Sequence, residues 1–354
     1  SLALSSAAIV CAAPQDSSKS AGSSRSAGKN MVAESALRER VLQMLSDGAV
    51  ANEALIRANS IEGLQAAPSR AEPAARAGLS DENAGVRFVA AMTVGLLRLK
   101  DSAPFVEPLM NDRDPRVRCA AMYALTRLGK TVDLSPLAIM LEDPDPRFRS
   151  EAARVLGELG NASAIPMLRV AAAQSTRSGA STGAEGRYQS ERIFQLQVAE
   201  ALAKLGDEGA SDSIRAALYP AAREGFESAA LAAQILGNIK DSKAIGQLVD
   251  LIEQTAPGTK TFEDPRKNTF VQPPEVRLAA ARSLALMGYP GGMYVAEMYE
   301  KEPIPSIRGQ VAFVYAAGGR RADLDRLERM LNDPDPMVRI AAAASTLQLL
   351  NRVP

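Results

Sequence analysis

The polar and apolar positions of this chain follow a repeat of about thirty-one residues. The stretch at 112–129 returns, with its Asp-Pro start and its arginine in register, at 143–160 and at 333–350. One arginine marks each copy, at Arg57, Arg87, Arg118, Arg149, Arg277, Arg308 and Arg339. Degenerate copies anchored at Gln195 and Ala229 fill the interval between the two runs. A fixed period of this length is typical of stacked structural repeats.

Each copy contains one helical stripe. Apolar residues stand three, seven and ten positions after the marker, as in Ala152, Leu156 and Leu159, and that spacing places them on one face of a helix. A glycine commonly follows the stripe, where a left-handed C-terminal cap favours glycine. These glycines are Gly129, Gly160, Gly206 and Gly288.

A second, shorter apolar helix is predicted after each glycine, for example over 164–168, 244–248 and 324–327. Asp114, Asp145 and Asp335 stand before the marker helices, where an aspartate caps a helix and the following proline fits its first turn. Two antiparallel helices per copy result. The sequence therefore predicts an all-α protein of about eight helix pairs over residues 31–354.

The pattern Asp-x-x-x-Arg-x-x-Ala-Ala-x-x-Leu-x-x-Leu-Gly resembles the HEAT-like repeats of the phycobilisome-lyase type. The resemblance implies an α-α superhelix, or HEAT-repeat α-solenoid, whose second helices line the concave face. It also implies an Arg/Asp ladder between neighbouring units, formed here by Arg87, Arg118, Arg149, Arg277, Arg308, Arg339, Asp114, Asp145 and Asp335. Such repeats support many unrelated functions, so the resemblance indicates architecture and not activity.

Two insertions interrupt the period, and insertions in a solenoid project from one edge of the stack. The segment 175–189 is rich in Gly and Ser and is predicted to be a flexible loop. The segment 255–274 combines aromatic residues with cations, a mixture common at binding hot spots, and its candidate partner-binding residues are Phe262, Phe270, Lys260, Arg266 and Lys267. The alternative is that the phenylalanines pack back onto the helices.

A third candidate lies in the second helix at 291–299. Tyr294 and Tyr299 are five residues apart and cannot both point inward, so one of them is a candidate for partner contact on the concave side. Part of the same stripe belongs to the core.

The composition narrows the range of functions. The sequence has no histidine, which removes the usual general base and the commonest metal ligand. Its two cysteines, Cys11 and Cys119, are too few for a zinc site or a disulfide framework. Lys plus Arg equals Asp plus Glu at 41 each, so no nucleic-acid partner is expected. We expect neither a cofactor nor a metal.

The N-terminal segment 1–30 joins a short apolar run to a polar stretch, which resembles the end of a bacterial export signal. Cleavage near Ala13 and lipid attachment at Cys11 are both open, and only the second would tie the protein to a membrane. The sequence thus predicts an exported, periplasmic or envelope-associated protein; the alternative is a cytoplasmic one.

These observations favour a non-catalytic scaffold or adaptor that binds another protein. The alternative is a phycobilin-lyase-like enzyme that attaches chromophores, or a chaperone. Neither a catalytic nor a cofactor-binding residue is assigned.

Overall fold

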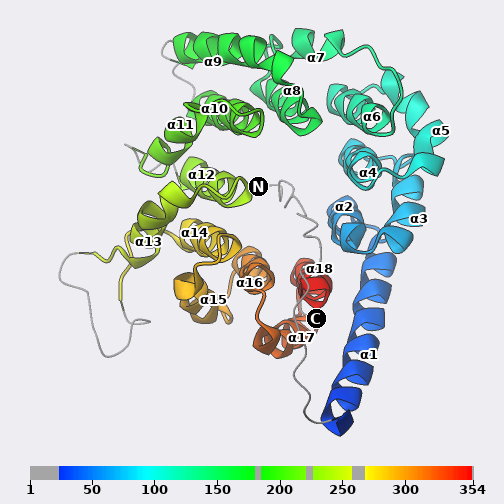
Figure 1. Cartoon of the computed structure of the whole chain (residues 1–354), viewed down its shortest axis with the longest axis vertical. Coiled ribbons are helices and arrows are strands. Elements are labelled where there is room, and N and C mark those ends of the chain that lie inside the picture. The colour runs from blue at the N-terminus through cyan, green and yellow to red at the C-terminus, as the bar shows by residue number, and fades with distance from the viewer. Residues whose placement is uncertain (1–23, 180–184, 221–225, 257–267, 353–354) are drawn as a thin grey trace.

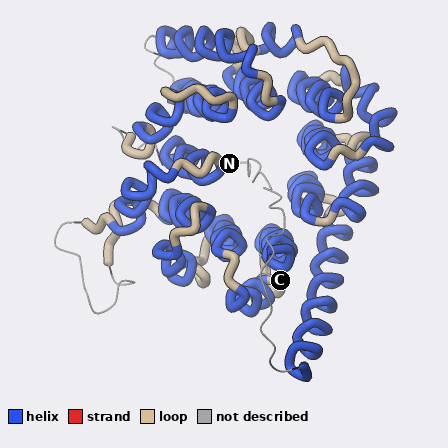
Figure 2. The backbone as a smooth tube through the Cα atoms, viewed as in Figure 1, coloured by secondary structure: helices blue, strands red, loops and turns tan. Residues whose placement is uncertain are grey.

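The computed structural model describes residues 24–179, 185–220, 226–256 and 268–352. This part of the chain is all-α and contains no strand, only one isolated β-bridge between Thr255 and Phe270. Helices alternate between two concentric layers (Figures 1 and 2). The prediction of an all-α repeat fold is confirmed, with nine helix pairs in the described residues where about eight were predicted.

The helices that carry the repeated arginine, together with α10 and α12 of the two degenerate copies, form the inner layer (Figure 1). They are α2 (Ala54–Gly63), α4 (Ala84–Leu97), α6 (Pro115–Arg127), α8 (Pro146–Leu159), α10 (Glu185–Lys204), α12 (Phe226–Asn238), α14 (Pro274–Leu286), α16 (Pro305–Gly318) and α18 (Pro336–Arg352). The outer layer contains α1 (Ser24–Gly48), α3 (Pro68–Gly78), α5 (Ala103–Val106), α7 (Ser135–Met140), α9 (Ile165–Gly179), α11 (Ala210–Ala216), α13 (Ile245–Glu253), α15 (Met293–Tyr299) and α17 (Leu324–Met330).

This arrangement corrects the expectation that the second, shorter helices line the concave face. They lie outside, and the alanine-rich marker helices lie inside. The inner circumference is the shorter one, so neighbouring inner helices must approach closely, and small side chains permit that approach. A Cβ added at Gly157 of α8 would stand 2.7 Å from the Cα of Ala201 on α10.

The two ends of the array meet, so the inner helices form a closed ring (Figure 1). The last helix, α18, packs against both α1 and α2, and one hydrophobic core continues from Val41 and Leu45 to Leu347 and Leu350. Polar contacts add to the closure: Arg38 donates to Asn351 Oδ1 at 2.7 Å. The repeat pattern predicted a superhelix but gave no sign of its closure.

The predicted stripe is confirmed as core. Residues three and seven positions after the marker are buried, as in Ala152 and Leu156 of α8 and Ala280 and Leu284 of α14, while the residue ten positions after it is half-buried, as at Leu159.

The predicted helix ends are confirmed as well. Asp114, Asp145 and Asp335 each accept a hydrogen bond from the backbone N–H two residues later. The glycines after the stripes have positive φ, as left-handed caps require: Gly129, Gly160, Gly206 and Gly288.

Two segment boundaries differ from the prediction. Helix α1 already begins at Ser24, within the segment 1–30 that was expected to be unpacked, because its serines, alanines and lysine continue the helix without a Pro or Gly run to stop it. The predicted loop 175–189 is largely helical: α9 extends to Gly179 and α10 begins at Glu185. Residues 1–23, with Cys11 and Ala13, and 180–184 lie outside the described residues. No described helix is both long enough and apolar enough to cross a membrane.

Candidate functional site

A bidentate arginine–aspartate ion pair joins neighbouring repeats at three junctions of the described residues. Arg87 of α4 binds both carboxylate oxygens of Asp112 at 2.8 Å, and its Nη1 donates to the carbonyl of Asp81 at 2.9 Å. Arg57 with Asp81 and Arg308 with Asp333 repeat the same bidentate geometry. Bidentate arginine–carboxylate pairs combine strength with fixed orientation, so the ladder sets the angle between units.

Of the six predicted ladder arginines, Arg87 and Arg308 form the bidentate pair, and the acids that receive it are not the predicted ones. Asp114, Asp145 and Asp335 cap helices, and the carboxylate that receives the arginine stands two residues earlier in the chain, as at Asp112 and Asp333. That earlier aspartate also accepts the backbone N–H of the capping aspartate. The Asp-x-Asp pair therefore has two separate structural roles.

Three of the predicted ladder arginines have other partners. Arg118 donates to the carbonyl of Asp112, and Arg339 to those of Asp333 and Pro334. Arg149 pairs with Glu191 of α10 at 2.5 Å and lies over the Phe194 ring. Of these three, Arg149 precedes a disrupted repeat, since the unit after it carries the first insertion. Arg118 and Arg339 keep the bond to the carbonyl six residues earlier that Arg87 and Arg308 also make, and lack the carboxylate.

Arg277 departs furthest from the ladder. Its side chain is 0% exposed, and no carboxylate of the described residues lies within ion-pair distance of it. Its Nε donates to the carbonyl of Ile252 at 3.0 Å and its Nη1 to the hydroxyl of Tyr299 at 2.6 Å. Its Cζ stands 3.3 Å from the centroid of the Phe270 ring. Burial of a guanidinium with no carboxylate partner among the described residues is costly, and a cation–π contact offsets part of that cost.

The structure thus brings three of the predicted partner-binding residues together around Arg277. Phe270 and Tyr299 touch it, and the hydroxyl of Tyr294 shares the Ile252 carbonyl at 3.3 Å. Burial raises the pKa of Tyr294. The other candidates in this insertion, Phe262, Lys260, Arg266 and Lys267, lie outside the described residues.

The insertion is held at its stem. The backbone N–H of Ala256 donates to the carbonyl of Thr269 at 2.8 Å, and that of Val271 to the carbonyl of Gln254 at 3.0 Å. Phe270 lies between these bonds and packs on Arg277, so the stem is fastened to α13, α14 and α15. Sequence reasoning assigned Arg277 to the ladder and missed its role as the centre of this cluster. The position twenty-five residues after the arginine is aspartate for Arg87 and Arg308 but Glu302 for Arg277; that spacing alone does not predict the pair, because Asp143 stands at the same distance from Arg118 and does not receive it.

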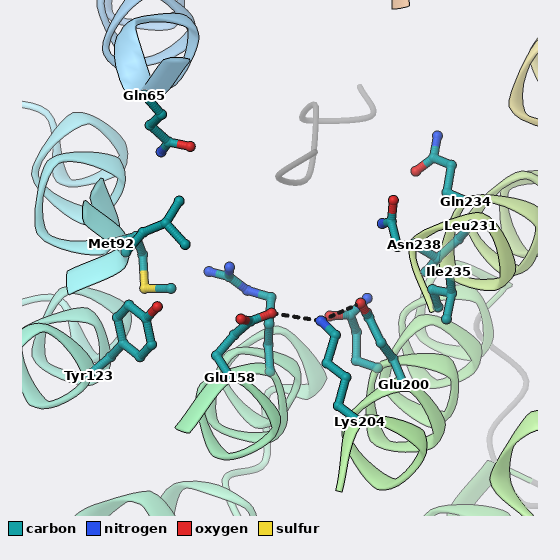
Figure 3. A pocket seen from close by; sticks show the side chains of 13 residues that line it. Gln65, Met92, Tyr123, Glu158, Glu200, Lys204, Leu231, Gln234, Ile235 and Asn238 are labelled. Atoms are coloured by element: carbon teal, nitrogen blue, oxygen red, sulfur yellow. Dashed lines mark hydrogen bonds and ion pairs between the residues drawn. The ribbon is translucent and has the colours of Figure 1, made fainter. Parts of the chain in front are cut away.

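A polar pocket opens on the inner side of the ring, and sequence reasoning missed it entirely (Figure 3). Its volume is about 60 Å³. The lining comes from η1 (Leu64–Ala66) and from α4, α6, α8, α10 and α12. Lys204 stands between Glu158 at 2.6 Å and Glu200 at 2.7 Å, which ties α8 to α10. The only hint in the sequence was the presence of charged residues inside the marker helices, off the apolar stripe.

Comparison with known proteins agrees with this architecture. The chain matches the HEAT repeats family over residues 39–126, 72–143 and 109–184, and a HEAT repeat is matched again over 324–352. No curated protein matches the sequence.

Several solved structures are similar to the chain. One is the complex of CpcE and CpcF of phycocyanin lyase from Nostoc sp. PCC7120, with 20% identity, a TM-score of 0.37, and coverage of 78% of this chain and 94% of that one. Human deoxyhypusine hydroxylase in complex with glycerol has 16% identity and a TM-score of 0.36, with coverage of 80% and 96%. An engineered protein has 14% identity and a TM-score of 0.33, with coverage of 92% and 96%.

Proposed function

The chain is a HEAT-repeat protein, and we propose that it is a non-catalytic scaffold that binds another protein at the insertion between α13 and α14. Repeat proteins of this kind present extended surfaces, and their insertions gather on one face that is often the binding face. We also propose that it acts outside the cytoplasm, on the grounds of the export-like sequence before residue 24.

One observation carries the proposal. Among the described residues, Arg277 makes no ladder ion pair with the next repeat. It contacts the Ile252 carbonyl and the Phe270 ring instead, and so holds the stem of the insertion. The two matched arginines, Arg87 and Arg308, each hold an aspartate of the next unit. At this position the ion pair between repeats is replaced by contacts that hold the inserted segment. This replacement supports a functional role for the position of that segment.

The closed ring supports the same location. An open solenoid presents its concave side to a partner, whereas here the inner helices close into a ring around that side (Figure 1). The insertion joins outer helix α13 to inner helix α14, so its two ends lie at the edge of the ring and not on its inner side.

The absence of histidine supports the non-catalytic proposal, since it removes the usual general base. The alternative remains a lyase-like activity on a chromophore. An absorbance spectrum of the protein purified from its host decides between them, because a bilin absorbs visible light and a bare scaffold does not.

The decisive experiment replaces residues 257–267 with a Gly/Ser segment of equal length and leaves Phe270 and Arg277 in place. Chemical crosslinking in the host identifies proteins bound by the unchanged chain. We expect the replacement to abolish those crosslinks while helicity and melting temperature stay unchanged. The matched control replaces 180–184, in the other insertion, and should keep every crosslink. Retention of the partner after the first replacement would disprove the proposed location.

Phe262→Ala sharpens the result to one ring. We expect it to weaken binding of the identified partner by about tenfold or more, the loss typical of a hot-spot aromatic. Phe270→Ala, by contrast, should lower the melting temperature, because that ring covers Arg277.

A further inference from the structure

The charged side chains that line the pocket on the inner side of the ring balance one another (Figure 3). The lining holds two cations and two carboxylates, which are Arg154, Lys204, Glu158 and Glu200. The ammonium of Lys204 binds the carboxylate of Glu158 at 2.6 Å and that of Glu200 at 2.7 Å. A charged ligand of either sign would therefore find no surplus of opposite charge in this lining, and burial of an unpaired charge is costly. The pocket is better suited to an uncharged ligand.

Gln197 of α10 lines this pocket with an amide that has no hydrogen-bond partner among the described residues. The residue is only 6% exposed. Buried side-chain amides are nearly always hydrogen-bonded, so an unpaired one inside a pocket points to a group that is to be bound there. A primary amide carries an acceptor oxygen and an N–H donor side by side in one plane. The group that complements it therefore offers a donor and an acceptor with the same spacing.

Tyr123 of α6 brings a second unpaired polar group to the same pocket. The residue is 1% exposed, and its hydroxyl makes no hydrogen bond within the part of the chain that the structure describes. Its ring lies against the backbone of α4, where a Cβ added at Gly95 would stand 2.6 Å from Tyr123 Cε1. Burial and the charge of Glu158 raise the pKa of this hydroxyl, so it keeps its proton at neutral pH. It is therefore both a donor and an acceptor.

The other walls of the pocket also carry amides (Figure 3). Gln65 Nε2 donates to Thr93 Oγ1 at 2.8 Å, which leaves the oxygen of Gln65 as an acceptor. Across the pocket, Asn238 Oδ1 accepts a hydrogen bond from Arg282 at 3.3 Å, which leaves the N–H groups of Asn238 as donors. These walls thus add one uncharged acceptor and one uncharged donor. The lining is therefore rich in neutral hydrogen-bonding groups of both kinds.

We propose that this pocket binds a small uncharged molecule through a primary carboxamide group. The carboxamide pairs with that of Gln197 through two N–H···O bonds, one in each direction, and its second N–H donates to the Tyr123 hydroxyl. Met92, Leu96 and Ile235 give an apolar surface to its carbon chain. A cavity of about 60 Å³ has room for about two to four water molecules, which limits the bound part to a few non-hydrogen atoms. This site is separate from the insertion, so it goes beyond the proposed binding of a protein.

The test uses propionamide as the probe and the full chain labelled with ¹³C at the methionine methyl groups. Met92 lines the pocket, and Met92→Leu identifies its signal. We expect this signal to shift with propionamide and to saturate in the millimolar range, because so small a molecule supports no tighter binding. Butanone has the same shape but lacks the N–H donors, and propionate and propylammonium are charged, so all three should bind at least about tenfold more weakly. An equal response to any of them, or no response to propionamide because water alone fills the pocket, would overturn the proposal.

Two variants assign the binding to the unpaired groups. Gln197→Met keeps the side-chain volume and removes the amide, and Tyr123→Phe removes only the hydroxyl; each should weaken propionamide binding by about tenfold. Both changes remove a polar group that has no partner among the described residues, so thermal unfolding should show a fold that is retained or stabilised. Gln43→Met is the control, since Gln43 lies on outer helix α1 and donates to Asp47, and it should bind propionamide normally. Unchanged affinity in both pocket variants would show that the amide binds elsewhere and that the proposal is wrong.

Discussion

Gly63 of α2 and Ala344 of α18 touch where the ring closes: a Cβ on residue 63 would stand 2.9 Å from the Cβ of Ala344. It would stand equally close to Leu45 Cδ2 of α1. The closure therefore requires a glycine, which has no side chain, at position 63, where it contacts a residue 281 positions away in the chain.

Gly63→Ala should weaken the closure. Overpacking of a tight contact typically costs about 1–3 kcal/mol, and we expect a loss of that size in urea unfolding, with a larger radius of gyration in X-ray scattering. Gly309→Ala is the control, since its nearest neighbour would be Ala341 Cβ at 3.8 Å; it should stabilise the protein by about 0.5–1 kcal/mol, as Gly→Ala in a helix does. Equal behaviour of the two variants would show that the ends do not meet.

The sequence predicted each repeat well because its signals are local. Leu156 is core, Gly160 is a left-handed cap and Asp145 caps α8, and each of these follows from spacing within one unit. Ring closure depends on the total of the small rotations between successive repeats. No spacing within one repeat predicts that total rotation.

The sequence singled out Phe270 for the composition of its segment and Tyr294 and Tyr299 for their spacing on one helix, but it did not predict that they meet at Arg277. That meeting requires three separate elements to converge. The inner pocket could not be predicted from the sequence. Glu158 and Lys204 are forty-six residues apart, and the sequence pattern predicts each as an exposed charge on its own helix.

Cys119 should be unreactive in the folded protein. Its side chain is buried against Met140, with 3.3 Å between the sulfurs, and burial raises the pKa of its thiol to about 12. The thiolate is the reactive form, so little of it is present at pH 8. In a Cys11→Ser background, we expect no labelling by a disulfide reagent at pH 8 until urea is added. Rapid labelling of the native chain would place Cys119 outside the core.

Acid should weaken the ladder. Burial acts to raise the pKa of Asp112, but its hydrogen bond and ion pair with Arg87 outweigh this and lower it; the hydrogen bond from Arg308 lowers the pKa of Asp333. A lowered folded-state pKa contributes stability that is present above the unfolded value, about 3.9, and is lost as pH falls through the folded value. We expect the free energy of unfolding to hold above about pH 5 and to fall below pH 4. Arg87→Met should show a shallower fall, since it has already lost one of these pairs.

The two kinds of marker arginine should respond in opposite ways to the same substitution. Arg87→Met leaves the carboxylate of Asp112 buried and unpaired, and removal of one partner of a buried pair costs about 3–5 kcal/mol. Arg277→Met strands no carboxylate among the described residues, and it replaces a buried charge that has no counter-charge in that part of the chain with an apolar side chain that packs against Phe270 and Met298. Such replacements are often neutral or stabilising. Urea unfolding of both variants should therefore show a large loss for Arg87→Met and little or none for Arg277→Met. A loss at Arg277 as large as that at Arg87 would mean that Arg277 has a counter-charge after all, and that its contacts with Phe270 and Tyr299 are secondary to an ion pair.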